Sequence, residues 1–276
     1  MNNPMFRHST DSGWVSRSHR SIAPFRLVRP ATVDDAASAL ATDGAVAIAG
    51  GIDLVRRMRA GDAHGTLVDI SRLAELRSIE VEDDAILIGA LATHWGIETS
   101  ALLGDRLPAF RAAWTTIGNV RIRMAGTVGG NIMAGEAGYD GRVLLGAAGA
   151  TLIFRGTAGE VRVPAAAPSA GWPRAALLTG VSLPLAPASR IAFDRSLKPV
   201  VSVAVALDGG TATVGIGCAY AEPQFASGPA TQIAALADGF PDARDNPMGS
   251  SAYRRRMIGV LARRLLERLQ GGIRVG

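Results

Sequence analysis

The chain has 276 residues, 48% of them apolar and 19% charged, so it can build two hydrophobic cores and lacks the composition of a disordered protein. Its single cysteine, Cys218, excludes a disulfide framework and any cysteine-only zinc or iron–sulfur site, and the four histidines lack metal-ligand spacing. We therefore expect no metal site. The net charge of +5 comes from arginines near the two ends without interleaved aromatics, which argues against nucleic-acid binding. No apolar run is long enough to span a membrane.

The first part of the chain predicts alternating helices and strands. Thr32 and Asp35 have the form of a helix start, since a threonine caps the first turn and an aspartate favours its positive end. The elements expected in order are a helix over 33–41, a strand over 45–49, a helix between Gly51 and Gly61, and strands over 66–70 and 85–89.

The middle of the chain predicts a helix over 107–117, a loop-like segment over 118–131, a helix over 140–148 and a strand over 150–154. Five prolines then crowd the segment 164–190. Because prolines interrupt helices and sheets, we expect a passage between domains there, with a boundary near residue 186.

The last part of the chain predicts a hairpin and a long helix. The runs 200–207 and 211–217 flank Asp-Gly-Gly and are typical of paired strands. The terminal helix carries an apolar stripe, while its arginines at 254–256 are expected on a solvated face, with a surface that faces a partner as the alternative.

Two glycine pairs, Gly50-Gly51 and Gly129-Gly130, each follow an apolar run. Glycine bends can turn successive N–H groups toward one point, and beside a helix start they can hold a phosphate. Either pair alone is as readily an ordinary tight turn. With the polar neighbours Asp53, Thr127 and Asn131, however, the two pairs together indicate a nucleotide cradle that is neither a Rossmann nor a Walker type.

The segments AGGIDL (49–54) and GTVGGN (126–131) resemble the two flavin loops of the FAD-binding medium subunits of molybdenum hydroxylases, the carbon monoxide dehydrogenase and xanthine dehydrogenase family. GALATH (89–94), Ile122-Arg123 and the arginine-rich segment 253–264 are similar to other parts of that family. The resemblance covers roughly residues 22–270.

The resemblance implies an α+β protein: a two-lobed FAD-binding fold of the PCMH/vanillyl-alcohol-oxidase type, followed by a domain with a three-stranded antiparallel sheet packed on helices. The implied organisation is a flexible extension (1–21), an FAD-binding domain (22–185) with lobes of about 22–76 and 77–185, and a C-terminal α/β domain (186–276).

The resemblance also implies the cofactor-binding residues. One side of the FAD diphosphate is expected to face Ala49, Gly50, Gly51, Ile52 and Asp53, and the other to face Thr127, Val128, Gly129, Gly130 and Asn131, mostly through main-chain amides. A valine at Gly129 or Gly130 should then take the phosphate's place. Asp140 is expected to contact the nucleotide half, although a helix-start aspartate is an equal alternative.

Several residues depart from the family pattern or fit no site. Ile52 replaces a usual polar residue, and the loop 135–140 is altered, which puts a role for Glu136 in doubt. Lys198 either lies near the flavin ring or faces solvent. His94 has no triad partners nearby and is expected to be a packed or surface histidine, and Cys218 is expected to be a small core residue.

The implied function is electron transfer. FAD in this chain would receive electrons from two [2Fe–2S] clusters in a small subunit, fed by a molybdenum cofactor in a large subunit, and reduce an external acceptor; no catalytic acid, base or nucleophile is expected in this chain. A cytoplasmic dimer of heterotrimers, free or at the inner face of the membrane, is the expected assembly. The alternatives are a stand-alone FAD-dependent oxidase and a flavin-free assembly subunit.

Overall fold

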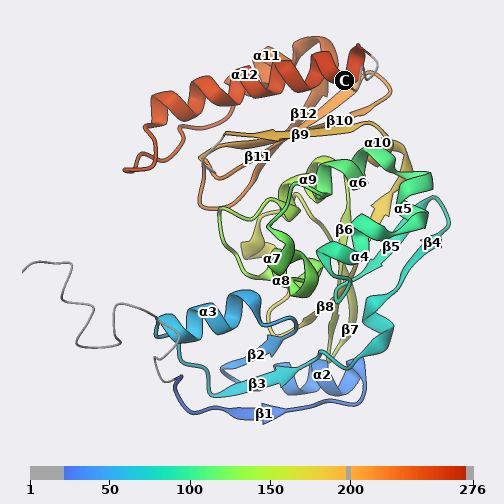
Figure 1. Cartoon of the computed structure of the whole chain (residues 1–276), viewed down its shortest axis with the longest axis vertical. Helices are drawn as coiled ribbons and strands as arrows, with labels where there is room; N and C mark the ends of the chain where they lie inside the picture. The colour runs from blue at the N-terminus through green and yellow to red at the C-terminus, as the bar shows by residue number, and fades with distance from the viewer. Residues whose placement is uncertain (1–21, 197–199, 272–276) are drawn as a thin grey trace, which may run out of the picture.

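A computed structural model describes residues 22–196 and 200–271. The predicted extension 1–21 and Lys198 lie outside the described residues. The described strands form three sheets, which follow one another from one end of the molecule to the other (Figure 1).

The first sheet is parallel and has the order β1-β3-β2. Thr32 caps the first helix by accepting a hydrogen bond from the Asp35 N–H at 3.1 Å, as the sequence predicted. The elements are β1 (Arg26–Val28), α2 (Val33–Leu40), β2 (Ala45–Ile48), α3 (Ile52–Ala60) and β3 (Thr66–Asp69), and the 3-10 helix η2 (Ala74–Arg77) leads onward.

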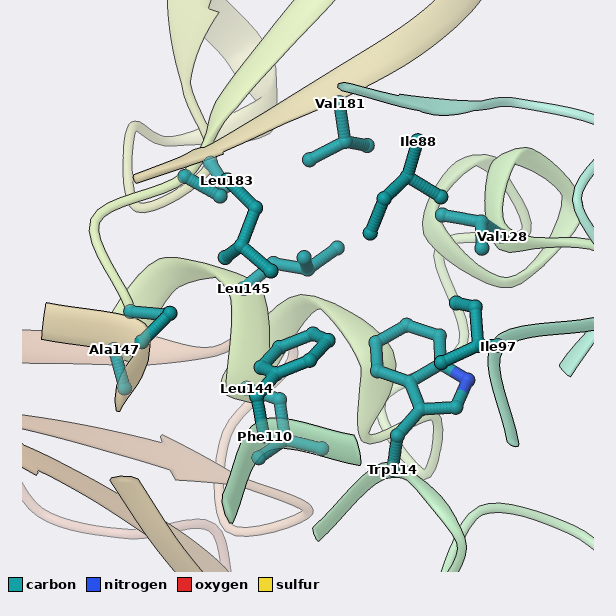
Figure 2. Packing of buried hydrophobic residues seen from close by; sticks show 14 of the residues in the cluster. Ile88, Ile97, Phe110, Trp114, Val128, Leu144, Leu145, Ala147, Val181 and Leu183 are labelled. Carbon is teal, nitrogen blue, oxygen red and sulfur yellow. The ribbon is translucent and has the colours of Figure 1, made fainter. Parts of the chain in front are cut away.

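The second sheet is antiparallel, with the order β4-β5-β8-β6-β7. Six helices lie in the chain between β5 and β6. All of them except the helix over Val120–Ala125 contribute apolar residues to the largest core against the sheet, where Phe110 and Trp114 pack near Ile88 and Val181 (Figure 2). The elements are β4 (Ile79–Glu82), β5 (Ala85–Gly89), α4 (His94–Thr99), α5 (Ala101–Arg106), α6 (Pro108–Trp114), α7 (Val120–Ala125), α8 (Val128–Met133), α9 (Gly141–Ala147), β6 (Thr151–Gly156), β7 (Gly159–Pro164), η3 (Ser169–Gly171) and β8 (Leu177–Pro184).

The third sheet is antiparallel, with the order β12-β11-β10-β9, and packs against two C-terminal helices (Figure 1). The predicted apolar stripe of the last helix is confirmed, since Leu261 and Leu265 are buried in the core of this sheet. The elements are α10 (Leu185–Ser189), β9 (Ile191–Arg195), β10 (Ser202–Asp208), β11 (Thr211–Gly217), β12 (Gln224–Pro229), η4 (Ala230–Gln232), α11 (Ile233–Asp238) and α12 (Ser251–Gln270).

The strand number expected for the third sheet was wrong, because this sheet has four strands rather than three. The hairpin β10–β11 was predicted, but the two strands that flank it have weak patterns. β9 has only a short buried run, Ile191 to Phe193, directly after the proline-rich segment, and β12 is nowhere fully buried. A strand of either kind gains its stability from its neighbours rather than from its own sequence.

The segment 118–131 was expected to be loop-like, but it forms two short helices, α7 and α8. Each begins at a side-chain cap. Asn119 Oδ1 accepts from the Ile122 N–H at 3.2 Å, and Thr127 Oγ1 accepts from the Gly130 N–H at 3.0 Å. Asparagine and threonine are favoured at helix starts, so these residues carried a signal that the surrounding glycines obscured.

Candidate functional site

The described residues enclose a cavity of about 480 Å³, which lies where the first and second sheets meet. This volume is in the range of pockets that hold small molecules and cofactors. Ten of the eleven predicted site residues line it: Ala49, Gly50, Gly51, Ile52, Asp53, Thr127, Gly129, Gly130, Asn131 and Asp140. The exception is Val128, whose side chain is fully buried in the large core.

The two glycine bends meet beside this cavity. A Cβ atom added to Gly50 would lie 1.7 Å from the carbonyl oxygen of Ala125, just ahead of the second bend. No side chain fits in that space, so the approach of the two bends requires glycine at this position. The first bend thus contacts the chain shortly before Gly129, and both glycine pairs line the same cavity.

The first bend leads into an uncapped helix start. Gly51 is the N-cap residue of α3, with φ +71°, and no side chain caps this nine-residue helix. The first N–H groups of a helix have no partner within the helix, and they carry the positive end of its dipole. Because Gly51 to Asp53 line the cavity, this helix start presents donors suited to a phosphate.

The second bend uses its N–H groups differently. Val128 donates to the Ala92 carbonyl at 2.9 Å, and Gly129 donates to the Ala90 carbonyl at 2.8 Å. The N–H groups of Gly130 and Asn131 are also engaged, both by Thr127. The sequence predicted that main-chain N–H groups of this segment would be free to bind the cofactor. The N–H groups of Val128 to Asn131 are instead bonded within the protein. The glycines give the cavity a wall without side chains.

Asp53 is held by a polar cluster, which we call the clasp and which consists of Asp53, Arg56, Glu136 and Tyr139. Asp53 Oδ1 accepts from Arg56 Nη2 at 2.6 Å and from the Tyr139 hydroxyl at 2.8 Å, and Arg56 Nη2 also bonds Glu136 Oε1 at 2.9 Å. Arg57 forms a further ion pair with Asp53 at 3.0 Å. Burial and the bond to Asp53 raise the pKa of Tyr139 to about 12.

The clasp joins α3 of the first lobe to the altered loop 135–140. Glu136, whose role was in doubt from sequence, pairs with Arg56, and Tyr139 lines the cavity beside Asp53. Two residues of this altered loop, Glu136 and Tyr139, therefore form one side of the clasp. Sequence reasoning missed Arg56 and Tyr139, because their partners Glu136 and Asp53 lie 80 and 86 residues away in the chain.

Asp140 lines the cavity but is only 2% exposed. It stands at the N-cap position of α9 without capping it, and its Oδ2 lies 3.3 Å from Arg195 Nη1. Its Oδ1 lies 3.9 Å from Cys218 Sγ. Burial raises the pKa of Asp140 above its usual value, despite the opposing effect of Arg195. Asp140 thus lies at a helix start, as the alternative expected, but its carboxylate pairs with Arg195 rather than with the N–H groups of the helix.

Arg195 and Cys218 complete the surroundings of Asp140. Arg195, on β9, also lines the cavity and is a functional candidate that sequence reasoning missed, since nothing in its neighbourhood marks it. Cys218 is buried, as expected of a core residue, and burial raises the pKa of its thiol to about 11, so it is protonated at neutral pH.

Arg254 is the exception to the solvated face expected at 254–256, whereas Arg255 and Arg256 are exposed as predicted. Arg254 is 1% exposed, and its guanidinium donates to the carbonyls of Val200, Cys218 and Gly249 at 3.0, 2.9 and 3.1 Å. It also donates to Asn246 Oδ1 at 2.7 Å. Five fixed donors allow arginine to satisfy several acceptors while buried, which a charge run in sequence does not reveal.

Two kinds of feature are missing from the part of the chain that the structure describes. There is no group of three or more histidine, cysteine or acidic side chains placed to hold a metal ion. No helix between residues 22 and 271, leaving aside 197–199, is long and apolar enough to cross a bilayer.

The sheets and the cavity between the lobes define a two-lobed FAD-binding fold. Residues 23–186 match the family described as "FAD binding domain in molybdopterin dehydrogenase". The carbon monoxide dehydrogenase medium chain of Afipia carboxidovorans is 29% identical over 278 residues, covering 88% of this chain and 96% of that protein. The xanthine dehydrogenase FAD-binding subunit of Escherichia coli O157:H7 is 37% identical over 115 residues, covering 41% and 39%.

A crystal structure of the Cu,Mo-CO dehydrogenase, in its cyanide-inactivated form, matches with a TM-score of 0.81 and 26% identity, covering 90% of this chain and 98% of that chain. The chain belongs to the family of FAD-binding domains of molybdopterin dehydrogenases. The resemblance seen in the two glycine segments is thereby confirmed, together with the oxidoreductase class and FAD as the cofactor.

Proposed function

We propose that this chain is the electron-transferring flavin subunit of a multi-subunit molybdenum hydroxylase. The observation that carries the proposal is the likeness to a carbon monoxide dehydrogenase medium chain over 96% of that protein, combined with a cavity at the meeting point of both glycine bends. FAD, when bound, supplies the redox chemistry, and the chain's own residues bind and orient it.

The residues around the cavity have distinct roles in this proposal. The uncapped start of α3, from Gly51 to Asp53, faces the diphosphate with its N–H groups. Thr127 to Asn131 form the opposite wall without intruding side chains, and Val128 acts only by packing beneath that wall. Asp140 holds Arg195 at the cavity. These groups bind and position the cofactor, and none of them acts as an acid, a base or a nucleophile.

The proposed domains are an FAD-binding domain over 22–185, with lobes of about 22–76 and 77–185, and a C-terminal domain over 186–276. The family match over 23–186 supports the boundary, as does the order of the sheets, since β8 ends the second sheet at Pro184 and β9 begins the third at Ile191.

The proposed partners are a large subunit with the molybdenum cofactor and a small subunit with two [2Fe–2S] clusters, assembled as a dimer of heterotrimers in the cytoplasm. The single cysteine supports this division, because [2Fe–2S] clusters need several protein ligands that this chain lacks. Electrons would pass from the clusters through FAD to an external acceptor.

A stand-alone oxidase is the second candidate, but the structure favours it less. The third sheet and its helices form a compact core of their own, and no described residue after Arg195 lines the cavity at the lobes. A flavin-free assembly subunit would have no use for a glycine cradle with an uncapped helix start.

The test is to purify the full-length chain and its native complex and to measure flavin and metals. We expect FAD near one per chain, molybdenum and iron in co-purifying subunits, and substrate oxidation by the complex only. Turnover by the isolated chain would instead support the oxidase, and a colourless chain that takes up no added FAD would support the assembly subunit.

A further inference from the structure

His94 is a buried side chain that the proposed function has not yet used. It is the first residue of α4, it is 1% exposed, and it lines the cavity. Sequence alone favoured a packed or surface histidine. The structure shows a packed histidine, whose ring is bonded to Trp114 of the core and also lines the cavity.

Trp114 fixes the proton on this ring. Its indole Nε1 lies 3.1 Å from His94 Nδ1. An indole nitrogen can only donate, so Nδ1 must be the acceptor and the proton of the neutral ring must be on Nε2. Burial, with a smaller contribution from Arg123, lowers the pKa of His94 to about 4, so the ring is uncharged at neutral pH.

The Nε2–H group points away from Trp114, because the two ring nitrogens lie on opposite sides of the imidazole. On that side lies Gly126, another cavity residue: a Cβ atom added there would be 3.4 Å from Nε2. No hydrogen bond from Nε2 to any described residue is present, whereas Nδ1 has its partner. Nε2 is not among the fully buried nitrogens that lack a partner, so it is open to the cavity that His94 lines. A ligand that fills the cavity would exclude water from this donor and must itself supply the acceptor, because an unpaired buried donor is costly.

We propose that His94 binds the cofactor directly, donating its Nε2–H to an acceptor atom of the bound dinucleotide. The inference rests on the proposed function. It adds an uncharged hydrogen-bond donor, the His94 Nε2–H, on the second-lobe side of the cavity, and the bond from Trp114 keeps the proton on that nitrogen. A neutral donor selects an oxygen or ring nitrogen by position, and its strength does not depend on pH near neutrality.

The variant that tests the donor is His94→Asn. The asparagine Oδ1 can take the place of Nδ1 and still accept from Trp114, while the Nε2 donor is lost. We expect FAD to bind the full-length apoprotein about five- to tenfold more weakly, as for the loss of one hydrogen bond. ADP and FMN titrations then show which half of the dinucleotide accepts, because only the contacting half should lose affinity.

Nitrogen NMR of the histidine-labelled wild-type chain separates binding from a structural effect. His94→Asn assigns the His94 signals. Before FAD is added, the shifts should report a proton on Nε2, and on addition the Nε2 signal should move while Nδ1 changes little. If the variant does not fold, the low pKa of His94, about 4, identifies its signals instead, because they stay in the neutral form at mildly acid pH.

Three results would overturn the inference: unchanged FAD affinity in His94→Asn, an Nε2 signal that FAD does not move, or a proton on Nδ1 in the free protein. A wild-type chain that takes up no FAD at all would defeat the proposed function itself, and the His94 inference with it. Wild-type FAD binding combined with any of the three results would defeat the His94 inference alone.

Discussion

The two glycine bends look alike in sequence but differ in structure. At the first bend, Gly51 opens a helix whose N–H groups are uncapped, whereas at the second bend the N–H groups of Val128 to Asn131 are bonded within the protein. The first bend can therefore attract an anion, and the second mainly makes room for it. The same Gly-Gly dipeptide thus provides N–H groups that can bind an anion in the first bend, and room for close packing in the second.

The strongest test of this difference is Gly50→Ala. The new Cβ would overlap the Ala125 carbonyl and force the two bends apart. We expect a 10- to 100-fold loss of FAD affinity, from an overpacking cost of about 1–3 kcal/mol. Isothermal titration of the apoprotein measures it. Gly65→Ala is the matched control, because nothing lies within 4 Å of its added Cβ; equal affinities for the two variants would refute the contact.

Gly129→Ala should act on stability more than on binding. Its Cβ would meet the Ala90 carbonyl and Cβ at 2.9 Å, so it would overlap protein atoms. Chemical denaturation should show a loss of about 1–3 kcal/mol in unfolding free energy. This changes the expectation from sequence that a side chain at Gly129 takes the phosphate's place, which now applies to the exposed Gly130 alone. A Gly129→Ala chain of native stability that fails to bind FAD would restore it.

Tyr139→Phe should loosen the first bend. The variant removes the hydroxyl that donates to Asp53 but keeps the ring at the cavity. We expect FAD to dissociate about two to five times faster, since a single partly exposed hydrogen bond is lost. Stopped-flow release measures this rate. Tyr220→Phe removes a hydroxyl bond to Pro241 in the third-sheet region and should leave the rate unchanged.

The smallest effect is expected for Thr127→Val. This change removes the cap on α8 and should cost about 1 kcal/mol of unfolding free energy. Because the second bend acts by shape, FAD affinity should stay within about twofold of the wild type, given the scatter of single-site effects. A large loss of affinity without a loss of stability would mean that the Thr127 hydroxyl contacts the cofactor directly.

The sequence predicted the parts of the site that depend on local chemistry. Glycine pairs, a following helix and nearby polar residues are visible within short windows. Together with the family resemblance, they led to cavity residues from Ala49 to Asp53 and to Thr127, Gly129, Gly130 and Asn131. Tyr139, Arg195 and the Trp114–His94 pair were missed, because their roles arise from contacts between distant segments.

The fold shows the same division. Strong apolar runs, such as those of β2, β5 and β10, were predicted close to their observed positions. The flanking strands β9 and β12 and the helix α7 lack such runs, and they depend on neighbours or on a single cap residue such as Asn119.

Arg254 donates hydrogen bonds to four residues, and these bonds connect the last helix to the third sheet. Through this one side chain, α12 is bonded to Val200, just before β10, and to Cys218, just after β11. The first residue of β10, Ser202, lies opposite Arg195 in the sheet. Deleting the twenty residues of α12 would thus remove the bonds that hold the backbone next to Arg195, which lines the cavity. A cofactor pocket built by the first 195 residues depends on an anchor near the end of the chain.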